Sequence, residues 1–287
     1  MMMPRISIVT PSYDQADFLE RTILSVLSQG YPHLEYIIID GGSKDGSVDI
    51  IRKYDARLAF WVSEPDRGQA DAIRKGFERA TGDVVGWLNS DDMYLPGALL
   101  RVAEGYRKNP QGALFYGDYI KVDEKDRCIA VRQKTSFDYR IVLHAYEIPI
   151  QPASFFDRRS YLAVGGIDTR FHYTMDHDLI LRLARRGTVH HVGGYLSAFR
   201  LHSSSKTMTV GKGYRFPEEA EQVWVKNVGR APYYGERFLL HWFHAMRLSV
   251  RMFKEGCLSC RLGGKGSPYR IGQTYAPSAD NWSQMFP

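Results

Sequence analysis

Short apolar runs alternate along residues 5–92 with segments in which apolar residues recur every three or four positions. The runs predict buried strands, and the 3.6-residue repeats predict helices that each present one apolar face. The predicted strands are 5–9, 34–39, 58–62 and 84–88, separated by predicted helices at about 18–29, 47–54 and 72–80. This alternation with short connections is typical of parallel strands joined by helical crossovers, so we expect an α/β fold with a mostly parallel sheet.

Polar residues follow each of these strands, led by Thr10, Asp40, Asp66 and Asp91. Parallel strands end at one common edge of a sheet, and ligands bind at that edge. Asp91 and its neighbour Asp92 follow the apolar run at once, and two unpaired carboxylates are too costly to bury. Their oxygens suit Mg²⁺ or Mn²⁺ bound together with substrate phosphates. The alternative is an Asp-rich turn that precedes a helix opening at Leu95-Pro96.

Composition narrows the classes of protein. The 287 residues are 44% hydrophobic and carry a net charge of +6, which suits an anionic partner such as phosphate or lipid. No basic-aromatic motif is present, so we expect no nucleic-acid partner. The start of the chain runs directly into a strand and no apolar stretch reaches 18 residues, which predicts neither a secretory signal nor a membrane span. Three cysteines fit a reducing cytoplasm, and we interpret Cys257 and Cys260 as a chance CxxC pair.

The chain changes character after residue 235. Residues 236–254 read as a basic amphipathic helix, and residues 263–287 are rich in Gly, Ser and Pro and are predicted to be poorly ordered. The helix could pack on the rest of the chain or on a second subunit of a homodimer, or it could lie on an anionic membrane. We therefore divide the chain into a catalytic domain, residues 1–235, and a C-terminal extension, residues 236–287.

Five motifs in a fixed order carry a resemblance to a known family. They are Val9–Tyr13, Ile39–Ser47, Glu64–Gly68, Gly86–Asp92 and Asp176–Leu179. With these motifs the chain resembles a family 2 glycosyltransferase with the GT-A fold, over about residues 5–205. The resemblance implies a nucleotide-binding half, about residues 1–110, and an acceptor half, about residues 111–210.

The resemblance also implies roles for individual residues. Asp176 would be the general base that activates the acceptor hydroxyl, and Asp91 would hold the metal on the diphosphate, with Asp92 beside it. His202, in a later Arg-Leu-His motif, would reach the metal or the diphosphate. The nucleotide would be bound by Thr10, Pro11, Ser12, Tyr13, Asp40, Ser43, Asp66, Arg67 and Ser90, and the donor sugar and acceptor by Trp87, Asp92 and Gln151.

The chain departs from the family pattern at two positions. The family often has an Asp-x-Asp triplet ending at Asp91, and here its first member is Asn89. The family also often has Glu-Asp at the catalytic helix, where this chain has Met175-Asp176. We interpret Asp178, in the same turn, as an acid that favours the helix dipole. Lys206, on the loop that follows, could neutralise phosphate.

These features imply an inverting glycosyltransferase that uses Mn²⁺ or Mg²⁺ and a nucleotide-diphosphate sugar, typically with UDP. The acceptor would be a saccharide or a lipid-linked molecule in polysaccharide assembly, and the enzyme would be cytoplasmic or peripheral at the inner face of a membrane. The alternatives are an inactive nucleotide-sugar-binding module and a sugar-phosphate nucleotidyltransferase. The latter would need a Gly-rich basic loop after the first strand, and a Rossmann dehydrogenase would need GxGxxG there.

Overall fold

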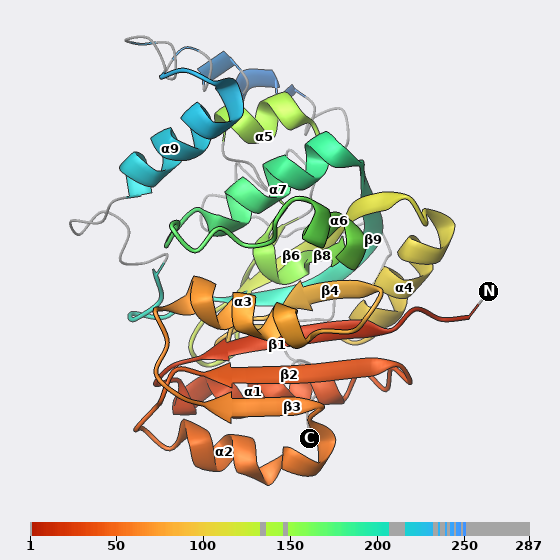
Figure 1. Cartoon of the computed structure of the whole chain (residues 1–287), viewed down its shortest axis with the longest axis vertical. Helices are drawn as coiled ribbons and strands as arrows, with labels where there is room; N and C mark the ends of the chain where they lie inside the picture. Colours follow the sequence, from red (N-terminus) through yellow and green to blue (C-terminus); the bar gives the residue numbers. More distant parts are fainter. Residues whose placement is uncertain are drawn as a thin grey trace.

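The computed structural model describes residues 2–132, 136–145, 149–206 and 216–231, together with 235, 239, 242–243, 245–247 and 249–250. A nine-stranded mixed sheet forms the centre of the described chain, with helices on both faces (Figure 1). The strand order is β3-β2-β1-β4-β8-β6-β9-β5, and β7 pairs with β6 outside this path.

The first half confirms the predicted parallel arrangement. Its elements are β1 Ile6–Ser12, α1 Ala16–Leu27, β2 Leu34–Asp40, α2 Ser47–Lys53, η1 Asp55–Arg57, β3 Phe60–Ser63, α3 Gln69–Arg79 and β4 Val84–Trp87. Strand β1 lies between β2 and β4 and is parallel to both. It ends three residues later than expected, because its backbone stays paired with β2 until Ser12 lies opposite Asp40.

The second half makes the sheet mixed. Its elements are β5 Met93–Tyr94, α4 Ala98–Lys108, β6 Gly112–Val122, β7 Cys128–Arg132, α5 Tyr139–Ala145, η2 Gln151–Ala153, β8 Ser154–Asp157, α6 Arg158–Ala163, α7 Met175–Arg186, β9 Thr188–Arg200 and α9 Phe216–Val228. Strand β8 is antiparallel to both β4 and β6, whereas β9 runs parallel to β6. The long strand β9 also pairs with β5, so its end returns beside the turn that follows β4.

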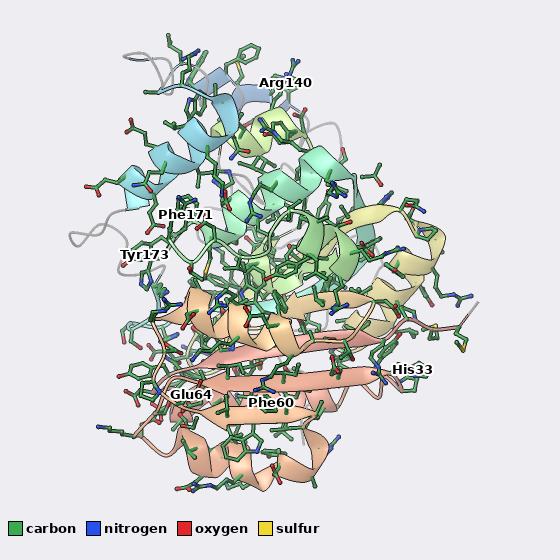
Figure 2. All side chains as sticks on the ribbon, viewed as in Figure 1. His33, Phe60, Glu64, Arg140, Phe171 and Tyr173 are labelled. Carbon is green, nitrogen blue, oxygen red and sulfur yellow. The ribbon has the colours of Figure 1, made fainter. Side chains whose placement is uncertain are left out.

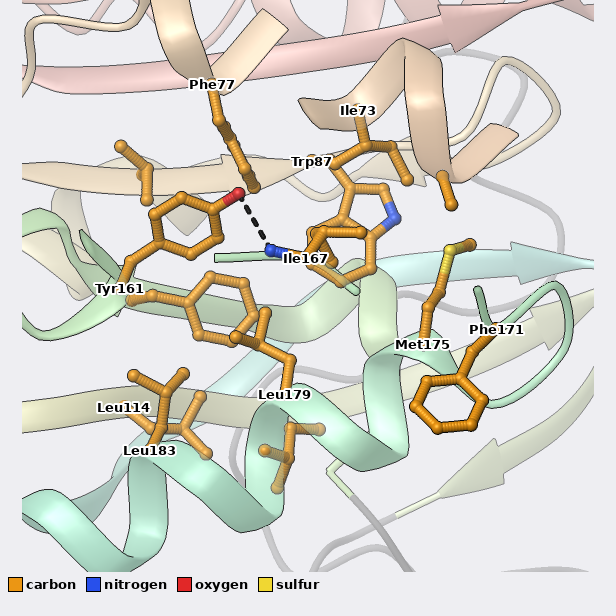
Figure 3. Close-up of a cluster of buried hydrophobic side chains, with 14 of the residues drawn as sticks. Ile73, Phe77, Trp87, Leu114, Tyr161, Ile167, Phe171, Met175, Leu179 and Leu183 are labelled. Atoms are coloured by element: carbon orange, nitrogen blue, oxygen red, sulfur yellow. Dashed lines mark hydrogen bonds between the residues drawn. The ribbon is translucent and has the colours of Figure 1, made fainter. Parts of the chain in front are cut away.

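Two apolar layers hold the helices on the sheet. Helices α1, α2 and α4 pack on one face and α3 and α7 on the other. Trp87 belongs to the second layer, where its ring stacks on Phe156 and contacts Phe77 edge to face (Figure 3). The sequence placed this side chain beside the donor sugar, but it is 1% exposed and lies in the core. A strand that is buried on both faces is apolar at every position, so its sequence does not show whether Trp87 faces a ligand or the core.

The C-terminal extension is described only in part. Residues 239, 242–243, 245–247 and 249–250 are helical, in agreement with the predicted helix. Cys257, Cys260 and the predicted poorly ordered tail lie outside the described residues. In the part of the chain that is described, no helix combines the length and the apolar character needed to cross a bilayer.

Candidate active site

The carboxyl ends of β1, β2, β3 and β4 meet at one edge of the sheet, where the sequence placed a ligand site. Figure 2 shows Glu64, just after β3, and Tyr173, just before α7, on this same side of the molecule. The turn that carries Asp91 follows β4 at the middle of the edge. Segments that are far apart in the sequence therefore converge around Asp91.

The turn after β4 is held from the opposite direction by the end of β9. Arg200, almost fully buried, donates its backbone N–H to Asp92 Oδ1 at 2.9 Å and its Nε–H to the carbonyl of Asp91 at 2.7 Å. Its guanidinium also pairs with Asp126 and lies 4.9 Å from the ring centre of Phe18. A buried charge of this kind is stable only when it is paired. We therefore interpret the bonds from Arg200 to Asp91 and Asp92 as the contacts that hold the turn in place.

His202 follows two residues later and reaches the same turn. Its Nε2 lies 2.9 Å from Asp91 Oδ2, and its Nδ1 lies 2.9 Å from the hydroxyl of Ser204. The imidazole is buried against Phe18, whereas the Asp91 side chain keeps 21% of its surface exposed. The structure thus brings together two of the residues that the sequence assigned to the metal.

The geometry at Asp91 and His202 fits a divalent cation. One carboxylate oxygen and one imidazole nitrogen 2.9 Å apart can bind the same ion, and this nitrogen-oxygen set suits Mn²⁺. Among the described residues no cluster of three or more His, Cys, Asp or Glu side chains forms a closed metal site. An ion held by this pair would therefore complete its shell with phosphate oxygens and water, as Mg²⁺ and Mn²⁺ do in nucleotide sites.

Asp92 does not share this geometry. Its side chain is 1% exposed, accepts the Arg200 N–H and lies 3.5 Å from the amide of Asn89. Burial, and then the charge of Asp91, raise the pKa of Asp92 well above its usual value. Its protein partners show that Asp92 supports the turn, and we interpret it as a residue that positions Asp91, while its contact with a metal or a sugar stays a prediction.

The predicted nucleotide strip occupies the ends of β1, β2 and β3. Thr10, Ser12 and Asp40 are buried, and Pro11 lies between them. Asp40 accepts hydrogen bonds from the N–H groups of Gly42 and Ser43 and from the hydroxyls of Ser43 and Ser63. Its carboxylate therefore shapes the 41–43 turn, and its contact with a base stays a prediction.

Tyr13, Gly41 and Asp66 gather beside this turn. Tyr13 is 63% exposed, so its ring faces solvent at the rim of the strip. A Cβ on Gly41 would lie 2.9 Å from Asp66 Oδ2 and 3.1 Å from the Tyr13 ring, so a larger residue here would displace these two side chains. Arg67 turns toward α3 and pairs with Asp71, and Ser90 is buried with its carbonyl bonded to Thr22.

Asp176 lies in the first turn of α7, at the positive end of the helix. It accepts the N–H of His177 at 2.8 Å, and burial raises its pKa to about 6 against the opposing effects of that hydrogen bond and of Lys206. Lys206 donates to Gln69 Oε1 at 2.8 Å, and burial lowers its pKa to about 8 although Glu219, Asp176 and Asp91 favour its charge. The ammonium therefore lies within electrostatic reach of both the predicted base and the predicted metal ligand.

Asp178 differs from the expectation for a dipole-facing acid. It is fully buried, and its oxygens pair with Arg182 at 2.6 Å and with Lys226 of α9 at 2.8 Å. Residues two apart on a helix point to nearly opposite sides, so Asp176 does not share the interior position of Asp178. We therefore interpret Asp178 as the ion-pair link between α7 and α9.

Glu219 was not predicted from the sequence. Its carboxylate, almost fully buried, accepts the N–H groups of His172, Tyr173 and Thr174 at 2.7–3.1 Å and the Thr174 hydroxyl at 3.2 Å. It caps the segment that leads into α7 from a position 45–47 residues away. No local pattern reveals such a cap, because its partners are backbone groups. For Arg200 a signal did exist, since its motif with His202 was recognised.

The fold and this edge define a glycosyltransferase of the GT-A type. The model of the glycosyl transferase family 2 matches residues 7–164, and the chain belongs to this family. A glycosyltransferase of Mycobacterium tuberculosis whose activity is uncharacterized is 34% identical over 184 residues, which are 63% of this chain and 69% of that protein. TuaG of Bacillus subtilis, whose name attributes it to teichuronic acid biosynthesis, is 44% identical over 94 residues, 32% of this chain and 37% of TuaG.

Solved structures support the same fold. TarS 1–349 of S. aureus in complex with UDP-GlcNAc superposes with a TM-score of 0.64 at 15% identity, over 90% of this chain and 76% of that one. The mannosyltransferase PcManGT of Pyrobaculum calidifontis, in complex with GDP-Man and Mn²⁺, gives a TM-score of 0.58 at 19% identity, over 92% and 77% of the two chains. At these identities the likeness establishes the architecture alone.

The cap at Glu219 yields the first prediction. Glu219→Ala leaves three N–H groups before α7 without their acceptor, and it should lower the free energy of unfolding by about 2–4 kcal/mol. Glu221→Ala, an exposed acid on the same helix, should change it by less than about 0.5 kcal/mol. Urea unfolding of both variants measures the difference, and equal stabilities would show that Glu219 does not carry the cap.

Proposed function

We propose that this protein is an inverting glycosyltransferase that moves a sugar from a nucleotide-diphosphate donor, most simply a UDP-sugar, to a saccharide or lipid-linked acceptor. The observation that carries the proposal is the pairing of two sites across the strand edge. Asp91 and His202 lie on one side, Asp176 lies on the other, and the Lys206 ammonium acts electrostatically on both acids. Family membership supports transfer of a sugar, and the arrangement of charges supports a donor that carries a diphosphate.

The donor would lie along the ends of β1, β2 and β4. Its nucleoside would contact the strip from Thr10 to Tyr13, with Asp66 at the far side, and its diphosphate would approach Asp91 and Lys206. Asp91 and His202 would hold Mn²⁺ or Mg²⁺, which when bound stabilises the negative charge that builds on the leaving diphosphate. The complex of PcManGT with GDP-Man and Mn²⁺ supports such a use of the fold. Gln151, almost buried, would lie on the sugar side of the turn.

The acceptor would be activated by Asp176. As the glycosidic bond breaks, the sugar passes through an oxocarbenium-like state, and the attacking hydroxyl must lose its proton. A carboxylate whose pKa is raised to about 6 is ionised at pH 7 and more basic than an ordinary one. Attack from the face opposite the diphosphate inverts the anomeric carbon in a single displacement, so no protein nucleophile takes part. An inactive binding module would not need this basic carboxylate, and a nucleotidyltransferase would need a phosphate loop after β1.

A groove beside α9 is a candidate site for the acceptor. A groove of about 630 Å³ is lined by Arg170, Phe171 and the α9 side chains Glu218, Glu221, Gln222, Val225 and Lys226. It adjoins the segment that Glu219 caps, just before Asp176. Its charged and polar lining suits a glycan, and the relation to TuaG supports polysaccharide assembly as the setting.

The second prediction separates catalysis from folding. Asp176→Asn keeps the shape of the side chain but removes the base, so the single-turnover rate of transfer should fall about 10²–10⁴-fold. Its stability should stay near wild type. Asp178→Asn breaks a buried pair with Arg182 and Lys226 and should instead lower the free energy of unfolding by about 3–5 kcal/mol. Wild-type transfer by Asp176→Asn would exclude it as the base.

The third prediction concerns pH. Because burial raises the pKa of Asp176 to about 6 and lowers that of Lys206 to about 8, kcat/KM should rise through pH 6 and fall through pH 8. Glu219, His172 and Asp91 interact electrostatically with Lys206, so their charges also influence the pKa that sets the upper limb of the profile. Ionising Asp176 is unfavourable in the folded state, so its contribution to stability declines from about pH 4 to pH 6. Lys206→Met should remove the upper limb and, because the ammonium lowers the pKa of Asp176, move the lower limb to higher pH. An unchanged profile would contradict this assignment.

The C-terminal helix supports a membrane-surface setting for the acceptor. Its described apolar side chains follow helical spacing and are 46–65% exposed, namely Leu239, Trp242, Phe243, Met246 and Val250. At least 46% of the surface of each of these side chains is therefore open to solvent. In the sequence, Arg237, Arg247, Arg251 and Lys254 fall along one flank of this stripe, as in helices that lie on anionic lipid. A lipid-linked acceptor would meet the enzyme at such a surface.

The fourth prediction tests this setting by flotation with liposomes of phosphatidylglycerol and phosphatidylcholine. Exchanging Trp242 and Phe243 for Gln should lower the bound fraction about tenfold or more, because each side chain loses apolar burial. Leu162→Gln, on the exposed face of α6, is the matched control and should bind as wild type. Equal binding of all three proteins would contradict the lipid surface. A shift from dimer to monomer without lipid binding would assign the stripe to a second copy of the chain.

A further inference from the structure

Three side-chain amides connect Lys206 to the backbone of β4 in one unbroken line. Lys206 Nζ donates to Gln69 Oε1 at 2.8 Å, and Gln69 Nε2 donates to Asn89 Oδ1 at 2.7 Å. Asn89 Nδ2 then donates to Gln151 Oε1 at 3.0 Å, and Gln151 Nε2 donates to the carbonyl of Trp87 at 2.5 Å. The line crosses the strand edge from the loop after β9, through α3 and the Asp91 turn, to η2.

The two ends of the line fix the direction of every bond. An ammonium can only donate a hydrogen bond, and a backbone carbonyl can only accept one. Each amide between them must therefore present its oxygen toward Lys206 and its nitrogen toward Trp87. Reversing any one amide would place oxygen against oxygen or nitrogen against nitrogen at its neighbours. Because chains of aligned hydrogen bonds polarise one another, the aligned amides strengthen the hold on the ammonium.

Asn89 is the middle member, and its chemistry is set by this line. Its Nδ2 faces two oxygens, Gln151 Oε1 at 3.0 Å and Asp92 Oδ2 at 3.5 Å. Its Oδ1 is already occupied by Gln69. An Asp at this position would direct a carboxylate oxygen at two acceptors. The amide is thus the residue type that the site requires, although relatives often carry an acid here.

We propose that Asn89 is a positioning residue and not a metal ligand, and that the Gln69–Asn89–Gln151 amide line aims the Lys206 ammonium at the diphosphate of the donor. This rests on the proposed function for the identity of the donor. The ammonium is bonded through Gln69 to Asn89, two residues before Asp91, and a diphosphate bound at Asp91 would approach it. The ammonium also donates a long hydrogen bond, 3.5 Å, to the backbone carbonyl of His172.

The test uses inorganic pyrophosphate as the probe, titrated by calorimetry into the full chain with and without Mn²⁺. Lys206→Met should weaken pyrophosphate binding about tenfold or more under both conditions, since one charge-assisted hydrogen bond is lost. Asn89→Asp should weaken it to a similar degree, even though it restores the acid of the family triplet. Gln69→Leu should do so as well without adding charge. Because Gln69→Leu adds no charge, it separates loss of the amide line from repulsion between a new carboxylate and pyrophosphate. It also serves as the test if Asn89→Asp does not fold.

Combining the variants gives the sharpest outcome. If the line acts through the ammonium, Lys206→Met with Gln69→Leu should bind no more than threefold more weakly than Lys206→Met alone. Asn109→Asp, which loses one amide-to-carbonyl bond at the end of α4, should bind as wild type. Tighter Mn²⁺-dependent binding by Asn89→Asp would make residue 89 a metal position and overturn the proposal. Additive losses, unchanged affinities, or a wild-type chain that does not bind millimolar pyrophosphate would overturn it as well.

The proposed function fails by a different result. If no nucleotide sugar is ever used as a donor while the pyrophosphate affinities follow the expected pattern, the amide line stands and the assignment of sugar transfer does not.

Discussion

The site depends on one link, the attachment of the turn after β4 to the end of β9. Arg200 and His202 contact Asp92 and Asp91 across a sequence separation of 108–111 residues. A buried guanidinium must satisfy its donors, and here its Nε–H donates to the Asp91 carbonyl, while its Nη1 contacts the Asp123 carbonyl and the Asp126 carboxylate. The exposed carboxylate of Asp91 is thereby held in place while Asp92 remains under it. If this link were broken, the turn would lose the support that aims Asp91 at the strand edge.

The remaining parts of the site are arranged around that turn by similar long-range contacts. Glu219 of α9 caps the segment before α7, so the position of Asp176 depends on a helix that follows it in the chain. The Asp178 pair with Lys226 ties the same two helices from inside the protein. Lys206 then joins the two halves, because it bonds to Gln69 on one side and lies within electrostatic reach of both acids. Donor and acceptor chemistry are therefore coupled through packing, and not through a single motif.

The sequence predicted the parallel strands, their common polar edge and Asp91 because these follow from local patterns. Apolar runs and helical repeats are set by nearby residues, and parallel strands must end together. The function of each polar residue was harder to infer. The sequence around Trp87, Asp92 and Asp178 does not show whether each side chain faces a ligand or the interior. These side chains are buried because β8, β9 and α9 pack against them. The roles of Glu219, Gln69 and Asn89 were missed because their hydrogen-bond partners are distant in the sequence. Gln69 and Asn89 are 20 residues apart, and Glu219 and His172 are 47 residues apart.

The most direct measurement is a crystal structure of the full chain with UDP and Mn²⁺, with the ion located by its anomalous scattering. We predict one ion that binds Asp91 and His202 at about 2.0–2.3 Å together with diphosphate oxygens. Lys206 should contact the diphosphate, and Asn89 should keep its bonds to Gln69 and Gln151. An ion bound by Asn89 or Asp92, or a diphosphate bound away from Asp91, would show that Asp91 and His202 are not the metal site.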